Sequence, residues 1–241
     1  MRRTLMACAA GLFGILGLSQ SAQAQWQVRQ TYLNTSTSTG NASGGTLANQ
    51  LENIDEGEAL LAGATGFVQS GNFTDSPQVI NYSGANFPGS GGSSGNATED
   101  FALEAVGVVG VINGSTGTFN LVVNSDDGFR LRRNGTTIFE FTGPTGNSNT
   151  GLNNVTLNDG DVLRLTFFER GGGEKLLFQV DADGLLGNPN SDPGAAANDR
   201  IFVGAAASGI SIVPIPEPAT AGLIGVAAVG LLARRRRPSA V

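Results

Sequence analysis

The fold of this chain is decided by residues 119–141, which read FNLVVNSDDGFRLRRNGTTIFEF. Phe119, Leu121 and Val123 recur at a period of two, with asparagines on the other face, which is the pattern of a half-buried β-strand. The chain then turns at residues 126–128, Asp-Asp-Gly. The stretch therefore predicts a strand that leads into a turn rich in carboxylates.

A second strand follows this turn. Phe129 and Leu131 share one face of it, and arginines occupy the other face. It ends at Asn134-Gly135, the strongest short-range signal for a tight β-hairpin. Residues 137–141 then form the return strand.

Weaker patterns predict the other elements. Further strands are expected at residues 25–32, 101–106, 108–112, 155–157, 162–168, 176–180, 201–203 and 210–213. Asp159-Gly160 predicts a second hairpin, and residues 47–62 fit a short helix that Gly57 interrupts. Polar or glycine-rich composition predicts loops at 35–45, 87–96, 144–153 and 184–198. Because the strong patterns all have the period of a strand, the sequence predicts an all-β domain.

Composition limits the number of domains and the possible partners. The 241 residues include 36 glycines and are 40% hydrophobic, which suits one β domain, placed at residues 25–213, with glycine-rich loops. The formal net charge is −6, but residues 25–218 carry 8 basic and 20 acidic side chains, a balance of −12. A chain this acidic is not expected to bind nucleic acid or an anionic membrane surface through charge.

The chain contains no histidine, and Cys8 is its one cysteine. Nucleophilic catalysis with a histidine base is therefore excluded, and so are the usual zinc and copper sites. Oxygen atoms are the ligands that remain, and they favour a hard cation such as Ca²⁺.

Residues 1–24 have the features of a secretory signal peptide. Arg2 and Arg3 precede an apolar run, and Ala22-Gln23-Ala24 ends with small residues at the spacing of a cleavage site, which marks Ala22 and Ala24. The apolar run is shorter than the roughly 20 residues that span a bilayer, which argues against a membrane anchor.

The C-terminus combines three features in a fixed order. Pro216, Glu217 and Pro218 precede an apolar stretch at 219–233, and four arginines follow it: Arg234, Arg235, Arg236 and Arg237. Residues 214–241 closely resemble the PEP-CTERM sorting signal. The resemblance implies a Gram-negative bacterium with an exopolysaccharide locus, export to the cell envelope or matrix, and an exosortase that processes the tail. The stretch of 15 apolar residues is short for a permanent transmembrane segment, which suits a transient one.

A second resemblance is carried by the run Ser125-Asp126-Asp127-Gly128, by Asn134-Gly135, by the strand that begins at Asp100 and by residues 155–169. Together they resemble the protective-antigen-type domain of toxins, glycosidases and adhesins, over residues 26–183. The resemblance implies an antiparallel β-sandwich or barrel. In lectin-like members the paired aspartates hold Ca²⁺ against sugar hydroxyls.

Asp126 and Asp127 are therefore the candidate calcium ligands, with oxygens of Asn124 or Ser125 nearby. The alternative is that Asp-Asp-Gly only makes a hairpin turn. For a second acidic motif, Asp181-Ala182-Asp183-Gly184, the favoured interpretation is a polar strand exit, because the glutamate of a calcium loop is missing.

Other residues are weaker candidates for ligand binding. Arg130, Arg132 and Arg133 are candidates for binding an acidic sugar, although balancing nearby acids on a solvated face is the favoured interpretation. The aromatic residues that could stack on sugar rings are Trp26, Tyr32 and Tyr82.

Three functions compete on this basis. The first is a non-enzymatic, calcium-assisted module that binds glycans or adheres to the extracellular polysaccharide matrix. The second is a structural matrix protein without a ligand. The third and weakest is a glycoside hydrolase, which needs two opposed carboxylates such as Glu140 and Glu169.

We predict that the chain is exported and trimmed at both ends, because its apolar flanks would expose large apolar patches on a polar domain. Intact-mass analysis of the envelope or extracellular fraction should find a chain that begins near Gln25 and lacks Arg234 to Arg237. Recovery of the full-length chain from the cytosol would contradict this prediction.

Overall fold

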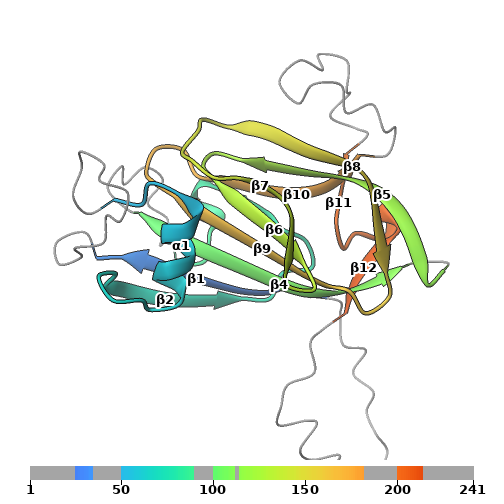
Figure 1. The fold of residues 1–241 in the computed structure, drawn as a ribbon, viewed down its shortest axis with the longest axis horizontal. Coiled ribbons are helices and arrows are strands. Elements are labelled where there is room, and N and C mark those ends of the chain that lie inside the picture. The colour runs from blue at the N-terminus through green and yellow to red at the C-terminus, as the bar shows by residue number, and fades with distance from the viewer. Residues whose placement is uncertain (1–24, 35–49, 90–99, 112–113, 182–199, 214–241) are drawn as a thin grey trace, which may run out of the picture.

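The computed structural model describes residues 25–34, 50–89, 100–111, 114–181 and 200–213. These residues form two antiparallel sheets packed face to face (Figure 1). One sheet has the order β2-β1-β4-β9-β6-β7, and β12 also pairs with β4. The other has the order β11-β10-β5-β8, and β3 also pairs with β10. The predicted all-β sandwich is confirmed.

The strands of the seven-stranded sheet are β1 (Gln27–Leu33), β2 (Gln69–Asp75), β4 (Phe101–Val111), β6 (Phe129–Arg133), β7 (Thr136–Phe141), β9 (Val162–Glu169) and β12 (Ile210–Val213). Those of the five-stranded sheet are β3 (Asn81–Ser83), β5 (Thr116–Ser125), β8 (Ser148–Asn158), β10 (Lys175–Asp181) and β11 (Arg200–Phe202). The helix is α1 (Ile54–Leu61), and the 3₁₀ turns are η1 (Gly84–Asn86) and η2 (Ala206–Ser208).

The main core lies between the two sheets. Leu121 and Val123 of β5 are fully buried there, as the period-two pattern predicts. Trp26, directly before β1, meets Phe178 of β10 edge to face with ring centroids 5.8 Å apart. Each layer therefore buries its apolar face against the other, which is the arrangement that holds a sandwich together.

A second, smaller core lies under α1, on the outer face of the seven-stranded sheet. Leu60 and Ile54 of the helix pack there with Ala102 and Phe168. A Cβ added to Gly57 would lie 2.9 Å from the Cβ of Phe168. The sequence predicted that Gly57 would interrupt the helix, and this prediction is wrong. Gly57 lies inside α1, where the absence of a side chain lets the helix approach the sheet closely.

Two predicted hairpins have different outcomes. Asn134-Gly135 joins β6 to its antiparallel partner β7, and both residues have positive φ, 50° and 82°, so this hairpin is confirmed. The prediction of a hairpin at Asp159-Gly160 is wrong, because the two flanking strands do not pair with each other. β8 pairs with β5, whereas β9 pairs with β4 and β6. The Asp-Asp-Gly turn likewise leads from β5 in one sheet to β6 in the other. Both connections are therefore crossovers between the two sheets. The sequence did not reveal this because an Asp-Gly pair indicates a local turn and not which strand the next strand pairs with.

Other boundaries also differ from the prediction. The strands expected at 101–106 and 108–112 are one strand, β4. Gly107 breaks the apolar pattern there because a Cβ would lie 2.6 Å from Ile212 and 2.9 Å from Trp26. The loop expected at 144–153 becomes strand from Ser148 onward. β2 and β3 were not predicted, and most of β2 is exposed and polar.

Several predictions fall outside the described residues. They concern the signal peptide at 1–24, the loops at 35–45 and 184–198, and the sorting tail at 214–241. In the part of the chain that the structure describes, no helix is long and apolar enough to cross a membrane.

Asp161 ties together two turns at the end of the sandwich opposite α1. One of its carboxylate oxygens accepts from Nδ2 of Asn134 at 2.6 Å, and the other accepts from the backbone N–H of Asn158 at 2.9 Å. Asn134 in turn accepts from the N–H of Val162 at 2.8 Å. The Asn134-Gly135 hairpin and the β8 to β9 crossover are thereby held against each other.

We predict that Asp161→Ala lowers the free energy of unfolding by about 2–4 kcal/mol, because it leaves two donors without a charged acceptor. Chemical unfolding monitored by tryptophan fluorescence would measure the loss. Thr136→Ala, on an exposed position of β7, is the control and should change it by less than about 0.5 kcal/mol. Equal stability of the two variants would contradict the assigned role.

Candidate functional site

The Asp-Asp-Gly crossover lies at the end of the sandwich that α1 covers (Figure 1). Three segments meet there: residues 126–128, 142–147 and 169–175. The backbone N–H of Asp126 donates to the carbonyl of Lys175 at 3.0 Å. A Cβ on Gly128 would lie 2.5 Å from the ring of Phe168, so glycine is required for the crossover to pass this point.

Asp127 is the internal tie of this end. Its side chain is buried, and Oδ1 accepts from the backbone N–H of Thr145 at 2.9 Å while Oδ2 accepts from that of Arg170 at 2.7 Å. One carboxylate therefore joins the crossover to both neighbouring loops. Burial raises the pKa of Asp127, and these two hydrogen bonds act in the opposite direction.

Asp126 is half-buried and lies at the surface of the same end. Burial raises the pKa of its carboxyl, whereas the backbone N–H of Asn147 and the charge of Lys175 lower it. A Cβ on Gly173 would lie 3.2 Å from Oδ2 of Asp126. The glycine-rich loop thus lies against the carboxylate of Asp126. The backbone of this loop would therefore be close to a ligand bound by Asp126.

The structure adds Glu169 to the acids at this end of the sandwich. The sequence suggested this residue only as a catalytic carboxylate of a glycoside hydrolase. It is buried, and Oε1 accepts from the N–H of Gly171 at 3.0 Å; Oε2 has no partner of good geometry among the described residues, although the carboxyl interacts with that of Asp127. Burial and, to a lesser extent, the charges of Asp127 and Asp126 together raise the pKa of Glu169 to about 9. At neutral pH this carboxyl holds a proton.

Asp100 is a second buried acid that sequence reasoning did not identify as part of the site. Neither of its carboxylate oxygens has a hydrogen-bond partner of good geometry among the described residues, although the N–H of Leu51 approaches. Burial raises the pKa of Asp100 to about 7, opposed by Leu51 and Arg170 and assisted by Asp127 and Glu52. Asp100 directly precedes β4 and Glu169 is the last residue of β9, so the only sequence signal is that both acids lie at the end of a strand.

The arrangement offers carboxylate oxygens in a setting without histidine or thiol ligands. Within the described residues, no group of three or more acidic side chains converges so that it could hold a metal ion unaided. Asn124, the predicted helper, donates to Oδ1 of Asn149 on β8 at 2.7 Å. Asp126 and Asp127 therefore stay predicted ligands that need water, backbone or sugar oxygens to complete a coordination sphere.

The arginine prediction is confirmed in its favoured form for Arg130 and Arg132, whereas Arg133 donates to the backbone carbonyl of Thr156. Nη1 of Arg130 donates to Asp55 at 2.7 Å and to Glu58 at 2.8 Å, and its Nε donates to Glu140. Arg132 is held by Glu58 through two hydrogen bonds. These two side chains balance acids on the outer face of the sheet.

The aromatic prediction is wrong. Trp26 and Tyr82 are buried, and Tyr32 packs between Phe73 and Phe101 with ring centroids 5.7 and 5.4 Å apart. They are core residues, because each lies in or next to a strand whose inward face needs large apolar side chains. In the second acidic motif Asp181 is buried, and Asp183 lies outside the described residues.

Comparisons with known proteins bear on the tail and on the fold. The family model of the PEP-CTERM protein-sorting motif matches residues 214–237, which confirms the sorting signal. The motif indicates an exported, cell-surface protein. A search of curated proteins finds no match.

Solved structures of PA14 domains, the protective-antigen-type fold, are similar to this chain. A PA14 sugar-binding domain from an RTX adhesin is 22% identical, covers 65% of this chain and 89% of its own, and gives a TM-score of 0.46. The PA14 domain of the MpAFP antifreeze protein is 17% identical over 66% of this chain and 83% of its own, with a TM-score of 0.40. The epithelial adhesin 9 A domain of Candida glabrata, in complex with Galβ1-4GlcNAc, is 13% identical over 67% and 83%, with a TM-score of 0.43. These likenesses concern the fold.

We predict that stability falls as pH rises from about 5 to 9 in the presence of chelator. Glu169 has a pKa of about 9 in the folded chain and an ordinary value when unfolded, so the folded state binds more protons across this window. Each such proton gives a slope of at most about 1.4 kcal/mol per pH unit. Glu169→Gln should flatten the decline above pH 7, where Asp100, with a pKa of about 7, has largely ionised. An unchanged slope in this variant would contradict the assignment.

Proposed function

We propose that this chain is an exported, non-enzymatic adhesive module that binds carbohydrate of the extracellular matrix with the help of Ca²⁺ at Asp126 and Asp127. One observation carries the proposal. A half-buried carboxylate, Asp126, lies beside the buried Asp127 at an end of the sandwich where the buried Asp100 has no hydrogen-bond partner of good geometry among the described residues. Buried oxygens without partners are costly unless a ligand satisfies them.

Ca²⁺ suits this end for chemical reasons. It takes 6 to 8 oxygen ligands in an adaptable geometry, so two carboxylates leave several positions for water and for sugar hydroxyls. Each carboxylate oxygen of Asp127 accepts one backbone hydrogen bond and retains a lone pair. Asp126 would supply the ligand nearer the surface, and the glycine-rich loop lies beside it.

Export fits this role. The sorting motif at 214–237 supports the proposal that an exosortase processes the chain. An adhesive domain delivered to the cell surface meets extracellular polysaccharide, which is the partner that we propose. The proposal includes that this chain comes from a Gram-negative bacterium.

A structural matrix protein without a ligand is the second candidate function. It is favoured by the observation that both oxygens of Asp127 already hold the neighbouring loops, so that the motif has a folding role of its own. The two functions differ in whether Asp126 has a role beyond the fold.

A glycoside hydrolase has weaker support. The two carboxylates that the sequence offered are held in separate networks. Glu140 is bound by Arg130 on the outer face of the sheet, and Glu169 is bound by Gly171 at the end of the sandwich. Release of reducing sugar from polysaccharide would be the observation that revives this function.

We predict that Ca²⁺ raises the melting temperature by roughly 5–10 °C. A ligand at 100 times its dissociation constant adds about 2.7 kcal/mol, and about 2–4 °C per kcal/mol is typical for a domain of this size. Mg²⁺ should do less, because it demands stricter octahedral geometry. Differential scanning calorimetry in millimolar calcium and in chelator measures the shift.

Asp126→Asn is the decisive variant, because this side chain accepts from one loop only, at the backbone N–H of Asn147, and asparagine keeps an acceptor oxygen there. It should abolish the calcium shift. Asp159→Asn, which also removes one negative charge but lies at the opposite end of the sandwich, should retain it. Binding on a glycan array should depend on Ca²⁺ and on Asp126. Identical melting of the wild-type chain in calcium and in chelator would favour the structural matrix protein instead.

A further inference from the structure

A row of valines crosses the outer face of the seven-stranded sheet, at the end remote from α1. β12 pairs with β4 through Val213 and Val108, and β4 pairs with β9 through Val108 and Val162. Residues directly opposite each other on neighbouring strands lie on the same face of a sheet. This face is the outer one, because the next residue of β4, Val109, belongs to the main core. Three neighbouring strands therefore each contribute one valine to the row.

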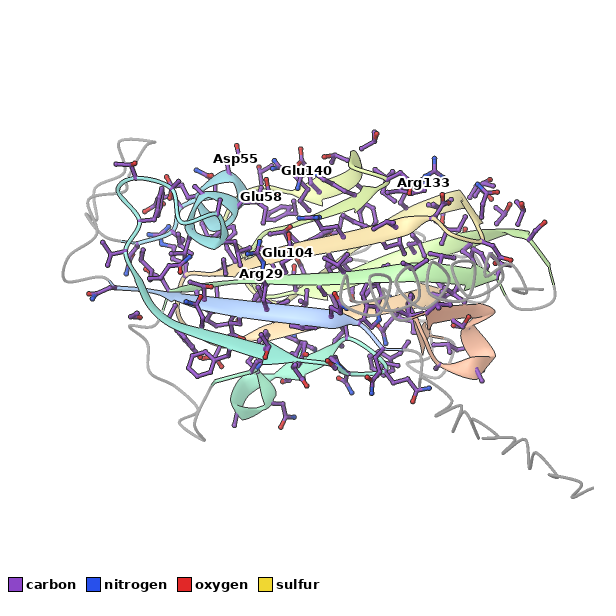
Figure 2. The ribbon with its side chains drawn as sticks, turned by 90° about the horizontal axis from the view of Figure 1, so that it is seen from below. Arg29, Asp55, Glu58, Glu104, Arg133 and Glu140 are labelled. Carbon is purple, nitrogen blue, oxygen red and sulfur yellow. The ribbon has the colours of Figure 1, made fainter. Side chains whose placement is uncertain are left out.

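The row is open to solvent. Val162 and Val213 are 37% and 46% exposed, and they are two of the five large apolar residues that stand out as exposed in the described part of the chain. Val108 and Val106, which follow each other on this face of β4, are half-buried. In Figure 2, Glu58 marks the α1 end of this face, and β12 lies toward the other end. These four valines form one apolar surface, here named the valine patch.

The valine patch lies where the chain leaves the sandwich. β12 ends at Val213, and the sorting motif matched at 214–237 follows directly. Ile212 of β12 is fully buried, so this strand is fixed in the sandwich. Six residue steps (219 − 213) lead from Val213 to Ala219, where the apolar stretch at 219–233 begins. Since an extended chain covers at most about 3.6 Å per residue, Val213 stays within about 22 Å of that stretch.

We infer that the valine patch rests on the surface of a lipid bilayer while the apolar stretch at 219–233 is inserted in that bilayer. The insertion is the one that the sequence predicts for the sorting tail, before the tail is removed. Val162 lies two strand spacings from Val213, about 10 Å, so the whole patch is close to the tether. A short tether makes the contact effectively intramolecular, and a patch too small to hold a free domain on a membrane is then sufficient.

Charge favours a neutral lipid surface as the occupant. Residues 25–218 carry 8 basic and 20 acidic side chains, a balance of −12, so an anionic surface would repel the domain. A second copy of the chain would carry the same negative excess and would be repelled as well. A zwitterionic lipid offers an apolar layer without this repulsion, and apolar side chains leave water for it.

The contact also orients the domain. Seven residue steps of β4 (108 − 101) separate Val108 from Phe101 at the acidic end of the sandwich, about 23 Å. A bilayer that touches the valine patch therefore leaves the surface at Asp126 uncovered. The inference requires neither Ca²⁺ nor a glycan.

The chain allows a label at one chosen position, because its one cysteine, Cys8, lies outside residues 25–241. This chain, made in a host without the sorting enzyme, is reconstituted in phosphatidylcholine vesicles without calcium or glycan. Val162→Cys carries a nitrobenzoxadiazole fluorophore, whose emission shifts to the blue in apolar surroundings. Val68→Cys is the matched control, because Val68 is a valine of 42% exposure that directly precedes β2 at the α1 end.

The label at residue 162 should shift to the blue. An interfacial apolar face lies about 5–10 Å deep, so lipid with a nitroxide near the top of its acyl chain should quench this label by about half. The label at residue 68 should show neither effect. Val213→Asp should lower the quenching at residue 162 about twofold, because the contact then has to bury a charge. Val68→Asp should leave that quenching unchanged.

Four results would each overturn the inference. A blue shift without nitroxide quenching would mean that protein covers the patch, either the sorting tail or a second copy. A label at residue 162 that stays in water, equal quenching at residues 68 and 162, or failure of the chain to associate with vesicles would also contradict it. None of these results involves Asp126 or Ca²⁺, so the proposed function is tested separately.

Discussion

The carboxylate of Asp127 holds together the end of the sandwich on which the candidate site depends. It accepts one backbone N–H from each of the two loops that flank the crossover, at Thr145 and Arg170. Because the chain passes here from one sheet to the other, no ladder of strand hydrogen bonds fixes these loops. A short, buried, charged acceptor replaces that ladder. The position of Asp126 at the surface follows from this internal tie.

The sequence predicted the strands better than their partners, for a physical reason. Asn134-Gly135 needs positive φ at both residues, and this local demand was enough to place the β6 to β7 hairpin. Asp159-Gly160 makes an equally tight turn, but β9 finds its partners in β4 and β6. Partner choice depends on which apolar faces meet, and those contacts join residues far apart in the chain. Glycines that permit close packing, such as Gly57 and Gly107, look in the sequence like interruptions.

The same distinction applies to the site. Asp126 and Asp127 were predictable because adjacent carboxylates before a glycine are visible in the sequence. Asp100 and Glu169 were not, because they reach the site only through the pairing of β4 with β9, which places residue 101 opposite residue 169. The prediction that aromatic residues stack on sugar rings was wrong for a related reason. Large aromatic side chains pack in a hydrophobic core as well as they stack on a sugar. Ion pairing of Arg130 was predictable because a strand that buries Phe129 and Leu131 must turn Arg130 outward.

Helix α1 links the acidic end of the sandwich to the ion pairs on the outer face of the seven-stranded sheet. Before it, Glu52 binds Arg170 at 2.9 Å beside the buried Asp100, and within it Glu58 holds Arg132 on that outer face. The close approach of Gly57 to Phe168 seats the helix on the sheet between these two contacts. A substitution in α1 is therefore expected to disturb the fold at both places and cannot assign a ligand to the acidic end. Asp126 lies at the crossover, outside the helix, so a variant there reports on the acidic end alone.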